Sequence, residues 1–155
     1  PQWVPPGTIG EATSEEYPLE KIDTRTVEFS HGGDQALDAP LEQLAESYDL
    51  EHEDYRGNYL VISTEDADRR GIGHGDMVSI ATEHGEAELM AAVTEGIRPG
   101  TVSVEPYGFG AGSVQPDEDG ANNMKLNDPS QFDIVSGQID RHLGIEVSKS
   151  GGEGA

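Results

Sequence analysis

The 155-residue sequence contains no cysteine, so it forms no disulfide bond and offers no thiolate ligand for zinc or an iron–sulfur cluster. Positive charge is scarce, because nine Lys and Arg residues face 31 Asp and Glu residues and leave a formal net charge of −22. Such a surface repels nucleic-acid phosphates and anionic lipids, which excludes a basic nucleic-acid interface and a polybasic membrane anchor. No apolar run approaches the roughly 20 residues that a membrane-spanning helix needs.

The acidic residues are spread along the chain and are not confined to a tail. Distributed carboxylates hold water and cations, and their repulsion is screened when the Debye length falls to about 3 Å at 1 M salt. The composition therefore favours a halophilic source over an ordinary acidic protein, while strand-like spacing of apolar residues argues against disorder. We expect circular dichroism to show loss of structure at low KCl and recovery near about 1 M. A thermal midpoint that salt leaves unchanged would contradict this.

The length corresponds to one domain, large enough to bury a core. Residues 1–16 are rich in proline and show no periodicity, which predicts a linker or tail. Residues 17–147 carry the ordered patterns, and the Ser- and Gly-rich residues 148–155 predict a flexible C-terminus. The chain begins at Pro1 and not at Met, which indicates a processed chain or a piece of a longer one.

Short runs of alternating or β-branched apolar residues predict six strands. They cover residues 20–29, 59–62, 77–82, 86–94, 101–105 and 144–147. Helical spacing predicts a short helix over residues 41–48. A second helix begins at the Ser63-x-x-Asp66 capping box and ends before Gly71, which takes the left-handed C-cap position. These elements predict a mainly β protein with short helices, folded as a compact barrel of mixed connectivity.

No motif for catalysis by the chain itself is present. The five histidines form no H-x-x-x-H or H-E-x-x-H pair, so we predict no dedicated metal site. Ser113 lacks the glycine two residues later that a G-x-S-x-G nucleophile elbow requires. The glycines of residues 71–75 end a helix and enter a strand, the reverse of a dinucleotide fingerprint.

The most informative run, residues 63–87 (STEDADRRGIGHGDMVSIATEHGEA), continues into residues 93–102 (VTEGIRPGTV). Together they resemble the C-terminal dinucleotide-binding domain of the molybdopterin oxidoreductases, the dimethyl sulfoxide reductase superfamily. The resemblance extends upstream to Tyr17-Pro18-Leu19 and downstream to residues 120–137, and covers about Tyr17 to Lys149. The first loop, Thr24-Arg25-Thr26, is tighter than the family's common Thr-Gly-Arg form, so the roles of its three residues are exchangeable.

The resemblance implies a six-stranded double-psi β-barrel that covers one side of a bis(molybdopterin guanine dinucleotide) cofactor with molybdenum or tungsten. Other domains of the parent enzyme would hold most of this cofactor and the metal, so the isolated chain is expected to be catalytically inactive. Arg25 would bind a phosphate and Asn122 a pterin or guanine edge. The implied cofactor-binding residues are Thr24, Arg25, Thr26, His31, Tyr107, Gly108, Asn122 and Asn123.

The parent would be a reductase of dimethyl sulfoxide, nitrate or sulfur oxo-compounds, or a formate dehydrogenase, working with an iron–sulfur electron-transfer subunit. Whether it is cytoplasmic or exported stays open. The alternative is a standalone double-psi barrel that recruits a protein or substrate, as the N-terminal domains of AAA unfoldases do. Only the first interpretation needs residues 24–26 and 120–123, and it predicts that Thr24–Thr26 and Asn122–Asn123 meet on one rim of the barrel.

Overall fold

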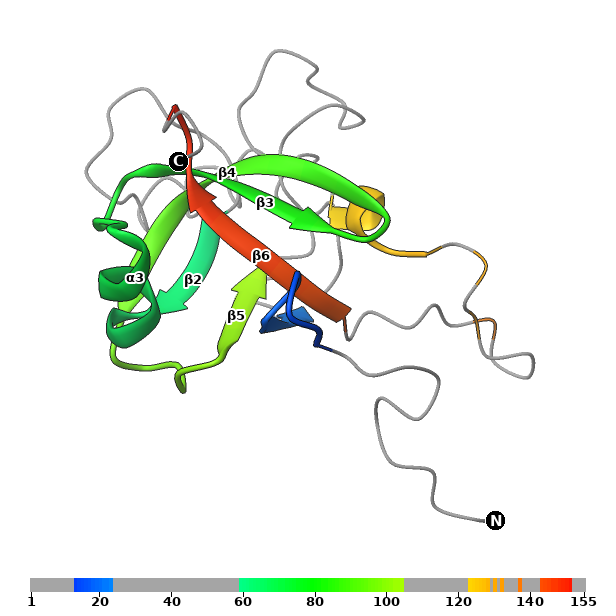
Figure 1. The fold of residues 1–155 in the computed structure, drawn as a ribbon, viewed down its shortest axis with the longest axis horizontal. Coiled ribbons are helices and arrows are strands. Elements are labelled where there is room, and N and C mark those ends of the chain that lie inside the picture. Colours follow the sequence, from blue (N-terminus) through cyan, green and yellow to red (C-terminus); the bar gives the residue numbers. More distant parts are fainter. Residues whose placement is uncertain are drawn as a thin grey trace, which may run out of the picture.

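A computed structural model describes residues 13–23, 59–104, 123–128, 130, 132, 137 and 143–151. Its elements are a set of six strands with one α-helix and one 3-10 helix (Figure 1). In chain order they are β1 (Leu19–Asp23), β2 (Tyr59–Ser63), α3 (Thr64–Arg70), β3 (Met77–Thr82), β4 (Gly85–Thr94), β5 (Thr101–Val104), η1 (Asn123–Leu126) and β6 (Leu143–Lys149). None of the helices in the described part of the chain is long and apolar enough to cross a membrane.

The six strands close into a barrel in the order β1-β5-β2-β4-β3-β6. Two pairs are parallel, β1 with β5 and β2 with β4, and the other four pairs are antiparallel. If β1 is exchanged with β4, β2 with β5 and β3 with β6, the β1–β5 and β2–β4 pairs interchange, the β1–β6 and β3–β4 pairs interchange, and the β2–β5 and β3–β6 pairs map onto themselves, each with its sense kept. The barrel is therefore built from two interlocked halves with equivalent connectivity, which is the double-psi arrangement that the sequence resemblance implied.

The core fills the inside of this barrel with aliphatic side chains, most of them β-branched. In β2, for example, Leu60 and Ile62 are fully buried, and in β5 Val102 and Val104 are fully buried. Each such side chain contributes about 1.5–3 kcal/mol through burial. The other members of the buried cluster are Leu19, Ala67, Ile72, Val78, Ile80, Leu89, Ala91, Leu126, Ile145 and Val147.

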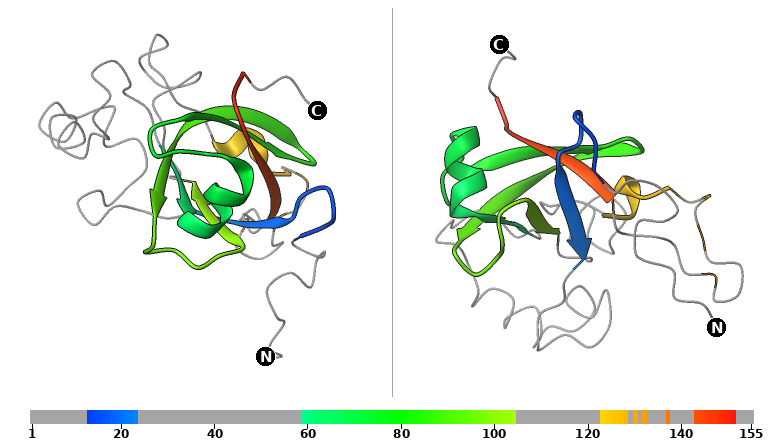
Figure 2. Two further views of the ribbon diagram at one scale, coloured as in Figure 1. Left: turned by 60° about the vertical axis from the view of Figure 1, so that its left-hand side comes forward. Right: turned by 60° about the horizontal axis from the view of Figure 1, so that its bottom comes forward.

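The barrel has two distinct ends. Helix α3 lies across one end and η1 lies at the other, as the two views of Figure 2 show. The C-terminal residue of β2, Ser63, pairs with Thr94 at the α3 end. The C-terminal residues of β1 and β5, Asp23 and Val104, pair with each other at the η1 end. We refer to these regions as the α3 end and the η1 end.

The structure confirms the predicted strands over residues 59–62, 77–82, 86–94 and 101–104, and the predicted helix with its caps. The first strand is confirmed as far as Asp23; its predicted continuation to residue 29 and the helix of residues 41–48 lie outside the described residues. The predicted last strand was too short. Ser148 and Lys149 extend β6 and pair with Ser79 and Val78 of β3, so they do not belong to the predicted flexible terminus. Their polar side chains gave no strand signal, but backbone pairing does not need apolar side chains.

Candidate functional site

The α3 end is organised around the carboxylate of Asp66, which is 2% exposed. The Ser63 hydroxyl donates to Asp66 Oδ2 at 2.6 Å, and the Asp66 backbone N–H donates to Ser63 Oγ at 3.1 Å. The same carboxylate oxygen accepts the backbone N–H of Gly100 at 2.7 Å. Asp66 therefore caps the helix and also fixes the turn between β4 and β5, a second role that its position in the capping box did not reveal.

The charges around Asp66 keep it ionised. Burial by itself raises the pKa of the Asp66 carboxyl, but hydrogen bonds from Ser63 and Gly100 and the charges of Arg70 and Arg69 outweigh burial and lower it below its usual value. Arg69 also pairs with Glu65 on the exposed side of the helix. Both arginines of α3 are therefore paired with carboxylates of the same helix.

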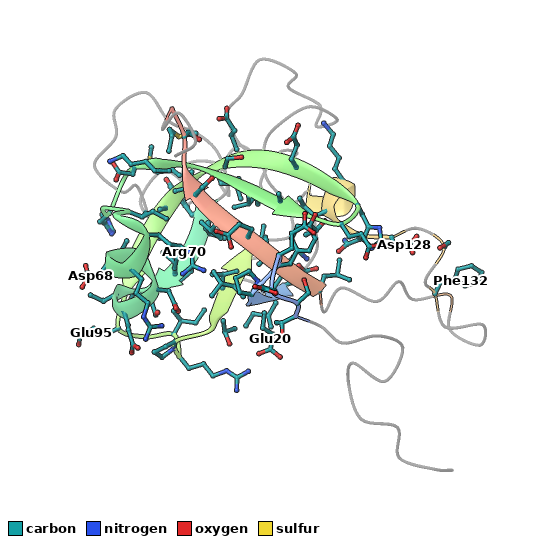
Figure 3. All side chains as sticks on the ribbon, viewed as in Figure 1. Glu20, Asp68, Arg70, Glu95, Asp128 and Phe132 are labelled. Atoms are coloured by element: carbon teal, nitrogen blue, oxygen red, sulfur yellow. The ribbon has the colours of Figure 1, made fainter. Side chains whose placement is uncertain are left out.

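The other cations at the α3 end are engaged in the same way. Arg98 pairs with Glu20 and donates from Nε to Thr101 Oγ1 at 2.8 Å. Lys149 lies 2.7 Å from Asp76, and this hydrogen bond, with one from the Gly73 N–H, lowers the pKa of the Asp76 carboxyl. The α3 end, marked in Figure 3 by Asp68 and Glu95, is a structural end whose described cations are already paired.

The glycine run of residues 71–75 belongs to this structural end. Gly71 has φ +65° and donates its N–H to the Ala67 and Asp68 carbonyls, which confirms the predicted left-handed C-cap. The run therefore closes a helix and leads into β3, as expected for a turn and not for a phosphate loop. His74 Nδ1 lies 3.3 Å from the Val93 carbonyl, so this histidine is held within the turn.

The η1 end is where all three of the predicted site segments join the described part of the barrel. Thr24 follows directly after Asp23, the last residue of β1, and Tyr107 comes three residues after Val104, the last residue of β5. Asp23 and Val104 are neighbours in the parallel β1–β5 pair. Asn123 is the first residue of η1.

A buried lysine links two of these segments at the η1 end. Lys21 is fully buried, and its Nζ lies 2.6 Å from Asp23 Oδ1 and 3.4 Å from the amide oxygen of Asn127. Asn127 follows η1 directly and is itself 3% exposed. Lys21 and Asn127 are 106 positions apart, so this contact joins the exit of β1 to the segment after η1.

The β3–β4 hairpin fixes η1 from the other side. The Thr82 hydroxyl donates to the Leu126 carbonyl at 2.8 Å, and the His84 N–H donates to Thr82 Oγ1 at 3.2 Å. At the start of β4, a Cβ atom on Gly85 would clash with the Lys125 carbonyl oxygen, so only glycine lets the two backbones approach this closely. The position of η1 is therefore set by backbone contact with the hairpin.

The structure places few of the predicted site side chains. Thr24, Arg25, Thr26, His31, Tyr107, Gly108 and Asn122 lie outside the described residues, and of Asn123 only the backbone in η1 is described. Lys21 and Asn127 are not among the site residues that the sequence predicts. The available signal was the alternation of Leu19, Lys21 and Asp23, which places a lysine on the inner face of β1. Among the described residues no group of His, Asp and Glu could hold a metal ion.

This fold and these two ends define the chain as a double-psi barrel with one structural end and one end at which distant segments converge. Comparison with known proteins gives the particular family. The family described as "Molydopterin dinucleotide binding domain" matches residues 38–142, more than half of the chain. The chain belongs to this family, within the molybdopterin oxidoreductases of the dimethyl sulfoxide reductase superfamily, which confirms the resemblance and the predicted molybdopterin guanine dinucleotide cofactor.

Individual relatives agree with this assignment. The chain is 38% identical over 79 residues to one subunit of the tetrathionate reductase of Archaeoglobus fulgidus, covering 51% of the chain and 7% of that protein. It is 28% identical to the trimethylamine-N-oxide reductase of Haemophilus influenzae, covering 96% of the chain and 18% of that protein. Acetylene hydratase from Pelobacter acetylenicus has the same fold, with a TM-score of 0.64, 14% identity and coverage of 87% of this chain and 19% of that one. The chain thus spans less than a fifth of these relatives' lengths.

The charges at the η1 end are compatible with such a cofactor, whose pyrophosphates are anionic. Two of the three lysines in the chain, Lys21 and Lys125, lie at this end. Lys125 is exposed and makes no ion pair with another described residue, unlike the cations at the α3 end. Asp128, labelled beside η1 in Figure 3, accepts hydrogen bonds from the backbone and hydroxyl of Ser130.

Proposed function

We propose that this chain is the cofactor-covering domain of a larger molybdopterin oxidoreductase, and that its η1 end is the face that meets the cofactor. The observation that carries the proposal is the geometry of the barrel. The exits of β1 and β5 are neighbours in one parallel pair, and the Lys21–Asn127 contact brings the segment after η1 to the same place. Residues far apart in sequence can therefore act on one ligand there.

The roles of the site residues follow from their chemistry. Arg25 binds a cofactor phosphate through its planar guanidinium, and Thr24 and Thr26 donate hydroxyl hydrogen bonds beside it. Asn122 and Asn123 pair with a pterin or guanine edge, since an amide both donates and accepts. His31, Tyr107 and Gly108 complete the face, with Gly108 allowing close approach of a backbone N–H. When bound, the cofactor supplies the redox chemistry, and this domain positions it.

The parent enzyme is, in this proposal, a reductase that transfers electrons to a small oxidised compound. Its curated relatives are named as reductases of tetrathionate, trimethylamine N-oxide, arsenate and nitrate, which supports this class without selecting one substrate. The remaining domains of the parent supply the metal ligand and most of the cofactor contacts. The proposal also includes an iron–sulfur electron-transfer subunit as a partner of the parent enzyme. Any cluster lies outside this chain, which has no cysteine to hold one.

The test is the cofactor content of the full-length protein that carries this domain. Arg25→Ala should weaken cofactor retention by about one to two orders of magnitude, since a charge-assisted hydrogen bond contributes roughly 1.5–3 kcal/mol. Asn122→Ala should weaken cofactor retention less, by about tenfold at most, because the hydrogen bonds of its amide carry no charge. Molybdenum or tungsten and guanine nucleotide are measured after purification in molar KCl.

Arg98→Ala is the matched control, because it removes the same charge from an exposed position at the α3 end. It should leave cofactor content at the wild-type level. Full occupancy in Arg25→Ala, or an equal loss in Arg98→Ala, would contradict the assignment of the η1 end as the cofactor face.

A further inference from the structure

A fully buried lysine is an unusual component of this barrel. Lys21 occupies an inner position of β1, on the same face as Leu19, where most inner positions of the barrel carry aliphatic side chains. Moving an ammonium group out of water is unfavourable unless partners compensate. The chain has only three lysines, and an apolar residue at this position would fill the core without that cost.

The ammonium group of Lys21 contacts one residue in β1 and one residue after η1. Asp23 is the last residue of β1 and sits 2.6 Å from the ammonium, with 11% of its side chain exposed. Asn127 ends the stretch that begins with η1, and its amide oxygen faces the same ammonium from a segment 106 positions away. One buried group therefore holds the two backbones from which the Thr24–Thr26 loop and the Asn122–Asn123 pair extend.

We propose that Lys21 is a positioning residue for the cofactor: its ammonium fixes the exit of β1 and the segment after η1 in one arrangement. This inference rests on the proposed function of the η1 end. Loops that are held in the binding arrangement before the ligand arrives lose less conformational entropy on binding. A site is also precise only when supporting contacts lock the residues that touch the ligand. Lys21 acts through Asp23 and Asn127 and does not itself touch the cofactor.

The experiment uses the full-length protein and follows release of molybdopterin guanine dinucleotide after dilution, by metal and guanine nucleotide analysis. Lys21→Met keeps the length of the side chain but removes the charge, and should release the cofactor about tenfold faster than wild type. Lys21→Arg keeps the charge and the hydrogen-bond donors, and should release the cofactor more slowly than Lys21→Met. A methionine variant with wild-type release, or an arginine variant as impaired as methionine, would overturn the proposal.

Lys149→Met separates positioning from a general effect of lost charge. It removes an equal charge, but from a half-exposed side chain at the α3 end, where Lys149 pairs with Asp76. Its release rate should remain within about twofold of wild type in molar KCl, where exposed charges are screened. If Lys149→Met accelerates release as much as Lys21→Met, the loss of positive charge alone explains the effect and the positioning role is wrong.

A second readout needs no cofactor. In cofactor-free protein, Lys21→Met should speed amide hydrogen exchange in residues 123–128 and leave α3 unchanged, because only the η1 end loses an anchor. If the methionine variant does not fold, Asn127→Ala takes its place, since it removes the same link and should release cofactor about threefold to tenfold faster. Release from Asn127→Ala at the wild-type rate would then overturn the proposal.

The outcomes distinguish this inference from the proposed function. Wild-type protein that contains no molybdopterin guanine dinucleotide would contradict the proposed function itself. Wild-type protein that contains the cofactor, together with a Lys21→Met variant that retains it equally well, would leave the proposed function standing and remove only the positioning role.

Discussion

The two ends of the barrel differ in what their long-range contacts join. At the α3 end, the Ser63–Asp66 bonds join residues three positions apart, while the Asp66–Gly100 and Lys149–Asp76 contacts join residues 34 and 73 positions apart. At the η1 end, the Lys21–Asn127 and Thr82–Leu126 contacts join residues 106 and 44 positions apart. The α3-end contacts fix one helix and the turns beside it, whereas the η1-end contacts hold the segment of residues 123–127 against β1 and the β3–β4 hairpin.

The two ends also differ in whether their described cations are paired with carboxylates. At the α3 end, Arg69, Arg70, Arg98 and Lys149 all pair with carboxylates. At the η1 end, Lys125 is exposed and unpaired among the described residues. In a chain with a net charge of −22, an available ammonium group distinguishes the end that can attract an anionic cofactor.

The largest expected effect of a single substitution is at Asp66. Asp66→Ala leaves the buried Ser63 hydroxyl and the Gly100 N–H without their acceptor, and removes one of the two carboxylates that pair with Arg70. The free energy of unfolding should fall by about 3 kcal/mol, measured by urea unfolding in molar KCl. If the two ends are independent, cofactor affinity per folded molecule should not change. A loss of affinity would show that the α3 end also contributes to cofactor binding.

The pH dependence of the same site gives a second measurement. The folded-state pKa of Asp66 is lowered, so its contribution to stability is complete above the unfolded pKa of about 3.9 and is lost as the pH falls through the folded value. The difference in unfolding free energy between wild type and Asp66→Asn should therefore be constant near neutral pH and shrink on acidification below about pH 4. A difference that grows on acidification would contradict the ionised state of Asp66.

A smaller effect is expected at Gly85, on the opposite end. In Gly85→Ala the new Cβ meets the Lys125 carbonyl, so η1 must shift. The free energy of unfolding should therefore fall by about 1–3 kcal/mol. Cofactor retention should fall as well, because η1 carries Asn123. Gly96→Ala is the control, since its Cβ would meet only the Thr94 hydroxyl at 3.4 Å. Unchanged retention in Gly85→Ala would show that the position of η1 does not matter for the ligand.

The smallest effect is expected at Gly71. Its φ of +65° is left-handed, and a Cβ there would have open space, so Gly71→Ala should cost only backbone strain of about 1 kcal/mol. Gly71→Asn should cost less, because asparagine tolerates this conformation better. Thermal unfolding in molar KCl measures both. Equal losses in the two variants would mean that the strain is not the cause.

Sequence reasoning succeeded where the determining contacts are local. The cap residues of α3 and the alternation of Val78 and Ile80 in β3 identified their elements, because each signal lies within a few residues. It missed the burial of Lys21 and the reach of Asp66 to Gly100, since both depend on how distant strands pair. The predicted contacts of Arg25 and Asn122 stay predictions, as they came from the family resemblance and lie outside the described residues.

The most direct test of the account compares hydrogen exchange in the full-length protein with and without its cofactor. The cofactor should slow exchange in residues 21–26, in residues 105–112 and in residues 122–128, which contain or directly adjoin in sequence the described residues of the η1 end. Residues 63–76 and 95–100, which form the α3 end, should exchange at the same rate in both samples. Protection that centres on the α3 end, with none at the η1 end, would contradict the central claim that the η1 end is the cofactor face.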